Sequence, residues 1–181
     1  MRAFGAVLVL AGLLACRGAQ AATYTDAARG FAIDYPDGWT VDPRFTDKGY
    51  RFFQGESEDV HDGVAFSPST DLAAGTVLQS DQLKLVVQRA RPADKCQASA
   101  FLLDPPPDYF TRTVVDKPEV TQTVAEAGDQ YVIEHLVVMV SQTPCLAVHY
   151  IIVAARSGKA FDHAKLVDYL NGIAKTIRPV K

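Results

Sequence analysis

The sequence predicts an α+β domain built on an antiparallel β-sheet that is covered on both faces, with an amphipathic helix at its C-terminus. Two long runs, residues 131–140 and 146–155, consist almost entirely of β-branched, aromatic and other apolar residues. Residues 141–144 between them have hairpin length, so the two strands are expected to pair antiparallel. A strand that is apolar at nearly every position is buried on both sides, so helices or loops must pack on each face of the sheet.

Helical spacing of apolar residues predicts the C-terminal helix. Residues three, four, seven and eleven positions apart share one stripe of a helix, and those residues are Leu166, Tyr169, Leu170, Ile173 and Ile177. Asp162 stands at the N-cap position, and Phe161 precedes it where a hydrophobic staple would begin. Pro179 prevents further helix.

Shorter segments complete the predicted domain. Alternating apolar residues predict strands at residues 30–35, 50–54, 63–67, 83–87, 110–115 and 120–125. Residues 97–103 are expected to form a short helix or turn, and the prolines at 105–107 a stiff surface connector. No linker or repeat divides the chain, which predicts a single domain over residues 22–181.

The first residues are typical of a secretory signal peptide. Arg2 is followed by an uninterrupted apolar run, and residues 19–21 read AQA, the small residues that a signal peptidase recognises. We therefore expect a signal peptide over residues 1–21. In the alternative, residues 13–16 (LLAC) resemble a bacterial lipobox, and Cys16 would carry a lipid anchor.

Charge and hydropathy restrict the partners of the mature chain. Removal of residues 1–21 leaves 160 residues, a length that suits one domain. It also removes Arg2 and Arg17, which leaves 16 basic residues against 21 acidic ones and a formal charge of −5. A chain of this charge has no electrostatic reason to bind nucleic acid or anionic lipid. The apolar run near the N-terminus is too short to span a bilayer, and no later stretch is long enough.

The cysteine count predicts one disulfide. The chain has three cysteines, and Cys16 is either removed or lipidated. Cys96 and Cys145 remain as an even pair in an exported chain, where oxidising conditions favour pairing. The alternative is two separate free thiols. A zinc site is not expected, because neither cysteine has a histidine or cysteine at zinc spacing.

Residues 31–39, FAIDYPDGW, resemble the opening signature of PsbP-like domains, an apolar strand followed by Tyr-Pro-x-Gly-Trp. The order of a long hairpin and a final amphipathic helix is similar as well. The resemblance implies an α/β/α sandwich around an antiparallel sheet. The family includes a photosystem extrinsic subunit, a Ran-binding protein and bacterial envelope proteins, and it is not known for enzymes. The matching residues are structural, so the resemblance assigns no functional residue and no cofactor to this chain.

Two clusters of polar residues are candidate sites. An acidic loop offers oxygen ligands of the kind that Ca²⁺ prefers; it contains Glu56, Glu58, Asp59, His61 and Asp62. Its spacing departs from the EF-hand pattern, and a solvated loop is the alternative. The second cluster is His135 and His149, which lie on the two strands of the long hairpin and would bind a metal or titrate near neutral pH if they meet. Glu134 beside them would be a buried general base; the alternatives are that it faces solvent or that it pairs with a basic residue.

These observations favour an exported, non-enzymatic binding or accessory protein of the bacterial cell envelope, periplasmic or secreted, that acts through contacts with a partner protein. No Walker loop, nucleophile elbow or zinc-protease motif occurs in the sequence, and no catalytic, cofactor-binding or metal-binding residue is assigned. Two alternatives stay open. One is a hydrolase or metal-dependent enzyme whose site is assembled from scattered residues, and the other is a carrier of small apolar ligands.

Overall fold

The computed structural model describes residues 21–46, 62–90, 96–101, 113–117, 119–127 and 130–180. Within these ranges the chain forms ten strands, one 3₁₀ helix and one α-helix. In chain order they are β1 (Ala21–Asp26), β2 (Phe31–Pro36), β3 (Thr40–Thr46), β4 (Asp62–Ser67), β5 (Lys84–Arg89), η3 (Ala98–Phe101), β6 (Thr113–Asp116), β7 (Val120–Ala127), β8 (Tyr131–Gln142), β9 (Cys145–Ala155), α1 (His163–Ala174) and β10 (Arg178–Pro179).

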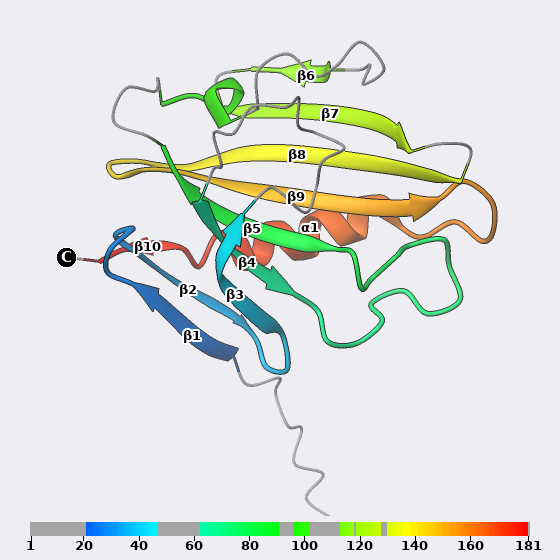
Figure 1. The fold of residues 1–181 in the computed structure, drawn as a ribbon, viewed down its shortest axis with the longest axis horizontal. Helices are drawn as coiled ribbons and strands as arrows, with labels where there is room; N and C mark the ends of the chain where they lie inside the picture. Colours follow the sequence, from blue (N-terminus) through cyan, green and yellow to red (C-terminus); the bar gives the residue numbers. More distant parts are fainter. Residues whose placement is uncertain are drawn as a thin grey trace, which may run out of the picture.

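The strands form two antiparallel sheets, which confirms the α+β class. The large sheet has the order β3-β4-β5-β9-β8-β7-β6, and a smaller sheet has the order β1-β2-β10 (Figure 1). The small sheet lies at the β3 end of the large one (Figure 1). Among the described residues, no helix is both long and apolar enough to cross a membrane.

The predicted hairpin is the centre of the large sheet. Strands β8 and β9 pair from Tyr131 and Ala155 down to Gln142 and Cys145, with one irregularity between Met139 and Ser141. Strand β9 is buried continuously over residues 146–153. Alternate side chains of a strand point to opposite faces, so burial of every residue means that both faces of β9 are covered, as predicted.

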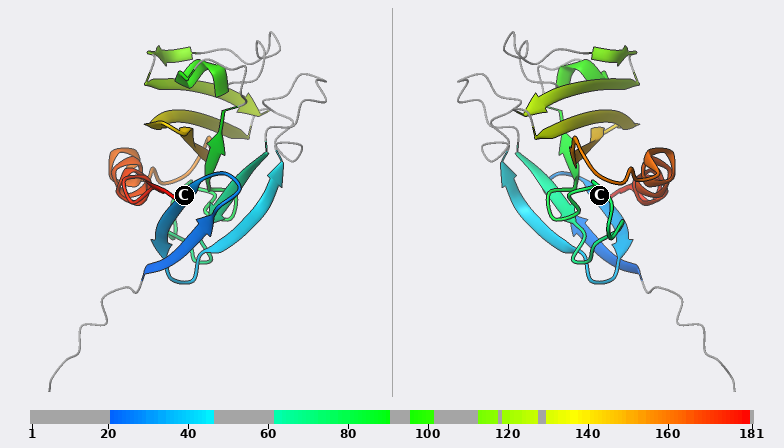
Figure 2. Two further views of the ribbon diagram at one scale, coloured as in Figure 1. Left: turned by 90° about the vertical axis from the view of Figure 1, so that its left-hand side faces the viewer. Right: turned by 90° about the vertical axis from the view of Figure 1, so that its right-hand side faces the viewer.

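One face of the large sheet packs against α1 and β2, and together they enclose the main core. This core contains residues of four strands and the helix: Phe31, Ile33, Val64, Phe66, Leu85, Val87, Leu146, Val148, Tyr150, Ile152, Leu166, Leu170 and Ile173. The Asp162 carboxylate caps α1 by accepting the backbone N–H of Lys165 at 3.0 Å, as predicted. The hydroxyl of Tyr150 donates to Oδ1 of Asn171 at 2.8 Å and so fixes the helix on β9. Figure 2 shows α1 to one side of the large sheet.

Two details of the predicted helix are wrong. The helix ends at Ala174, so Ile177 lies beyond it. Tyr169 is 41% exposed, and its ring packs beside Trp39 at a centroid distance of 6.2 Å. The stripe of residues that the sheet buries is therefore narrower than the apolar spacing suggests.

The predicted sandwich is wrong for the opposite face of the large sheet, since no α-helix covers it in the described ranges. The one α-helix there, α1, packs on the first face. Part of the opposite face is covered by η3, which confirms a short helical turn within residues 97–103. Ala98 and Phe101 pack there against Val137 and Ala147. A 3₁₀ turn of four residues covers only a small area, so helices flanking both faces are an overstatement.

Most short strands agree with the sequence. The predicted strands at 30–35, 63–67, 83–87 and 120–125 are β2, β4, β5 and β7, and β6 overlaps the prediction at 110–115. The predicted strand at 50–54 lies outside the described residues. The two outer strands of the small sheet, β1 and β10, were not predicted.

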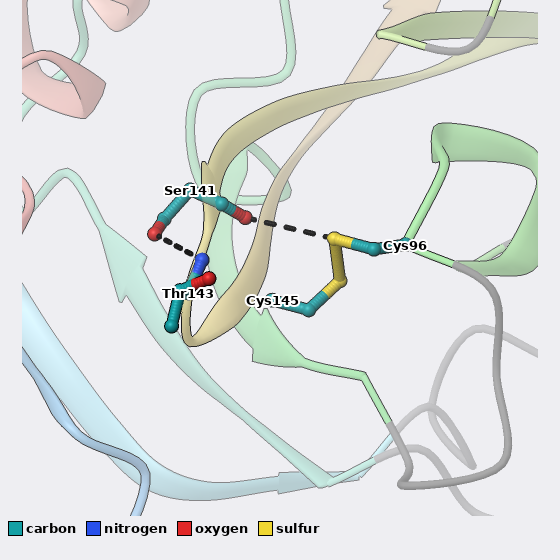
Figure 3. The surroundings of a disulfide bond; sticks show 4 residues. All are labelled: Cys96, Ser141, Thr143 and Cys145. Carbon is teal, nitrogen blue, oxygen red and sulfur yellow. Dashed lines mark hydrogen bonds between the residues drawn. A yellow bond between two sulfur atoms is a disulfide. The ribbon is translucent and has the colours of Figure 1, made fainter.

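A disulfide between Cys96 and Cys145 ties the cover of the second face to the sheet (Figure 3). The Cα atoms are 5.7 Å apart, and the bond joins residues that are 49 positions apart in the sequence. Sγ of Cys96 lies 3.8 Å from the carbonyl oxygen of Ser141 at the end of β8. Cys145 begins β9, and its carbonyl accepts the N–H of Ala90 at 3.0 Å. The bond therefore holds the segment before η3 against the β8–β9 turn.

Unreduced, denatured mature protein should contain no reactive thiol. Replacing both Cys96 and Cys145 with alanine should lower the free energy of unfolding by about 2–5 kcal/mol, because the unfolded chain regains the entropy of the open loop. Thiol titration and urea unfolding measure the two quantities. Two titratable thiols per chain would show that the cysteines are free.

Candidate functional site

His135 and His149 meet on the face of the sheet that η3 covers. His135 lies opposite Ile151, and His149 lies opposite Val137, so the two histidines are diagonal neighbours on one face of the hairpin. Nε2 of His135 is 2.8 Å from Nδ1 of His149, and the stacked rings have centroids 5.1 Å apart. The ring of Phe101 meets His149 edge-on at 6.0 Å. The expectation that the two histidines come together is confirmed.

The pair is buried, and His135 is uncharged at neutral pH. Both side chains are more than 90% buried. Burial lowers the pKa of His135 to about 4, because the imidazolium form loses its hydration. Across the 2.8 Å contact, one ring donates an N–H to a nitrogen of the other. The described residues contain no group of three histidine, cysteine or acidic side chains able to hold a metal ion.

Glu134 projects to the α1 side of the sheet and is partnered. Its Oε1 accepts a short hydrogen bond from the Gln122 amide, which comes from β7. Its Oε2 is 2.5 Å from Nε2 of His163, the first residue of α1. The alternative that Glu134 pairs with a basic residue is therefore confirmed, and the alternative that it faces solvent is wrong, since Glu134 is only 9% exposed. These contacts connect β7, β8 and the N-terminus of α1, where a negative charge is favourable.

The acidic loop lies almost entirely outside the described residues. Glu56, Glu58, Asp59 and His61 lie outside the described residues, and Asp62 is described only through its backbone at the start of β4. Its binding of a cation stays a prediction.

A surface groove beside α1 is a feature that the sequence did not predict. Its volume is about 480 Å³, and it lies between the segment 72–78 and the exposed side of the helix. The residues that line it are Leu72, Ala73, Leu78, Phe161, Asp162, Lys165, Leu166 and Tyr169. We call it the α1 groove. Its walls are mostly apolar, and the charges of Asp162 and Lys165 are the ionic groups of its lining.

Hydrogen bonds hold the loop wall of the α1 groove in place. Leu72 donates its N–H to the Ser80 hydroxyl at 3.1 Å, and that hydroxyl donates to Asp71 at 2.8 Å. Val77 donates its N–H to the Lys159 carbonyl at 2.9 Å and accepts from the N–H of Ala155 at 2.8 Å. The backbone N–H of Ala73 and the Ser80 hydroxyl lower the pKa of Asp71. Bonds within the protein thus fix the loop wall of the groove.

A second, polar groove of about 420 Å³ lies on the other side of Leu78. It is lined mainly by hydroxyl, amide and carboxylate side chains: Ser69, Thr70, Asp71, Thr76, Gln79, Ser80 and Asp81. The Asp71 and Ser80 side chains bond to each other, so part of this lining stabilises the loop.

Solved structures resemble this protein in the course of the backbone, at low sequence identity. No family model matches the sequence. No curated protein matches it either. The structure is similar to the Ran-binding protein Mog1p of Saccharomyces cerevisiae, with 11% identity, a TM-score of 0.45 and coverage of 91% of this chain and 97% of that one. It is also similar to the PsbP protein CyanoP of the cyanobacterium Synechocystis, with 10% identity, a TM-score of 0.43 and coverage of 94% and 98%.

The buried histidine should make the fold less stable in acid. The pKa of His135 falls from 6.5 in the unfolded chain to about 4 in the folded one, so between these values the unfolded state binds more protons. Stability is then present above pH 6.5 and is lost as the pH falls toward 4, at up to about 1.4 kcal/mol per pH unit for this group. Urea unfolding across this range should show a weaker pH dependence for His135→Phe than for the parent chain. In an NMR titration, the His135 ring should stay neutral down to about pH 4; a ring that titrates near 6.5 would contradict the assignment.

Proposed function

We propose that the protein is an exported accessory module of the bacterial cell envelope and that it binds a partner protein through the α1 groove. The observation that carries the proposal is the aromatic ring of Tyr169, 41% exposed at the border of an apolar depression of about 480 Å³. Tyrosine is enriched among the residues that dominate protein interfaces, since it offers a large contact area together with a polar end. Tyr169 is the one large hydrophobic side chain exposed in the described part of the chain.

The form of the groove suits a side chain of a partner. Its loop wall is fixed by the bonds of Ser80 and Val77, and its other wall is the capped helix α1, so little ordering entropy is lost on binding. The apolar walls favour an aliphatic or aromatic side chain. Asp162 and Lys165 supply one charge of each sign in the lining and favour polar contacts around it.

The side chains that the sequence offered as candidates for catalysis, Glu134, His135 and His149, make structural contacts in the described part of the chain. Glu134 bonds to Gln122 and His163, and His135 bonds to His149. These bonds join neighbouring secondary-structure elements, which is a structural task. They support a binding protein more than a hydrolase.

A carrier of small apolar ligands is the second candidate, because the volume of the α1 groove falls in the usual range of ligand pockets, about 300–1,000 Å³. Native mass spectrometry of protein purified from its host distinguishes the two functions. A carrier retains a small molecule of constant mass that is lost when Tyr169 and Leu72 are replaced by serine.

The mass of the mature protein tests whether the expected signal peptide is cleaved. If residues 1–21 form a cleaved signal peptide, the mature protein begins at Ala22, and intact mass or N-terminal sequencing of protein from the native host will show it. A lipid-modified Cys16 would instead establish the anchored form, and a retained Met1 would contradict export by a cleaved signal.

A photoreactive amino acid at Lys165 should cross-link the partner in the intact envelope. The added variant Tyr169→Ser should reduce the yield by about tenfold or more, because the exposed ring is lost, whereas Tyr169→Phe should retain it. A photoreactive residue at Gln142 is the matched control, because Gln142 is exposed and far from the groove. Gln142 pairs with Cys145 at the start of β9, whereas Leu78 of the groove bridges to Ala154 near the end of β9. Equal yields from Lys165 and Gln142, or no effect of Tyr169→Ser on a folded protein, would contradict the proposal.

A further inference from the structure

The two sheets have four edge strands in the described structure, and three of them are protected against further pairing. Strand β10 has two residues and includes Pro179. Strand β3 contains Pro43 and a register shift between Asp42 and Phe45. Strand β6 has four residues and its own register shift. Short length, proline and irregular register are the usual means of preventing a sheet edge from adding another strand.

Strand β1 has none of these features. It pairs with β2 in continuous register from Ala21 to Asp26, and it contains no proline, lysine or arginine. Its single charged residue, Asp26, is buried and paired with Arg29 at 2.6 Å. In Figure 1, β1 lies on the side of β2 that faces away from β10.

The hydrogen bonds of β2 show which backbone groups of β1 face outward. The N–H of Asp34 donates to the Thr176 hydroxyl at 2.9 Å, and its carbonyl oxygen lies 2.9 Å from the same hydroxyl, so both groups point away from β1. Thr23 is opposite Asp34 and therefore belongs to a non-hydrogen-bonded pair. Its N–H and C=O, and by alternation those of Thr25, point to the open edge. Among the described residues, none provides a hydrogen-bond partner for these backbone groups.

The two faces of β1 differ in polarity. The side chains of Thr23 and Thr25 are exposed. The ring of Tyr24 points to the other face, where it packs with Phe31 and Phe66 at centroid distances of 6.2 and 5.7 Å. A strand added beside β1 would therefore place alternate side chains against the border of the main core and in solvent.

We propose that β1 accepts an extended segment of a partner protein as an added antiparallel strand. The segment has Ser or Thr opposite Thr23 and Thr25 and apolar residues between them. It is uncharged at its centre, because the carboxylates of β1 and β2 are already neutralised: Asp26 by Arg29 and Asp34 by Arg178 at 3.0 Å. The proposal rests on the proposed binding function and adds a second contact to it.

A second copy of this chain fits the edge less well than a peptide does. In a mature chain that begins at Ala22, β1 keeps five residues and is roughly 17 Å long. Pairing along it alone buries much less than the roughly 1,200 Å² of a stable dimer. Extended peptides bind sheet edges through such limited contacts, because main-chain hydrogen bonds supply the affinity and side-chain pockets the specificity.

The test uses the mature, disulfide-bonded protein and a displayed library of random peptides of about ten residues. Selected peptides should alternate apolar with Ser or Thr residues, and they should slow amide exchange at Thr23 and Thr25 by about tenfold or more. Thr23→Pro should weaken their binding by about tenfold, since it removes an outward N–H and leaves the ladder to β2 intact. Thr23→Ala is the control, because it loses only the hydroxyl bond to Asp34 and should bind within about twofold. If Thr23→Pro does not fold, Thr25→Pro and the exchange data on the parent chain serve the same purpose.

Three results would overturn the inference. In the first, no peptide is enriched, or Thr23→Pro binds the selected peptides like the parent chain. In the second, the peptides shift only residues of the α1 groove, which leaves the proposed function standing. In the third, protection of Thr23 and Thr25 appears without peptide and increases with protein concentration, which identifies a second copy as the occupant.

Discussion

Strand β9 has no face toward solvent over residues 146–153, and the rest of the fold follows from the need to cover it. Pairing with β5 and β8 satisfies its backbone. Its even-numbered residues are covered by α1, and part of its odd-numbered face is covered by η3. Each cover is held by its own bond, the Tyr150–Asn171 hydrogen bond for α1 and the Cys96–Cys145 disulfide for the segment before η3. An apolar strand thus determines where a helix, a short turn and a cross-link are placed.

The buried polar residues of the hairpin define its register. The contact between His135 and His149 requires their diagonal relation, and a slip of one residue would put the two imidazoles on opposite faces. On the other face, Glu134 needs Gln122 at its diagonal position. A sheet of valine and isoleucine alone tolerates several registers, whereas these two pairs are satisfied in one. Buried polar pairs that are satisfied in this way specify one arrangement of the sheet.

Sequence reasoning was most successful where a pattern is long. The hairpin, the helix cap at Asp162 and the meeting of the two histidines all follow from periodicity and pairing rules. It failed for β1, since residues 21–26 contain one large apolar side chain, and their strand exists because β2 provides a partner. It also failed for Tyr169, whose apolar spacing is correct but whose environment depends on Trp39 and the loop 72–78, which are distant in sequence. The α1 groove lies between such distant segments, so no local pattern predicts it.

The disulfide also determines how the protein responds to force. Strands β6, β7 and β8 all lie between Cys96 and Cys145, inside a covalently closed ring of the chain. A pull on the two termini therefore cannot extend the segment between the two cysteines, and roughly 160 Å of contour length is released only when the bond is reduced. A protease that cuts within this ring leaves both fragments attached. Three of the seven strands of the large sheet are thus retained as one covalently linked unit.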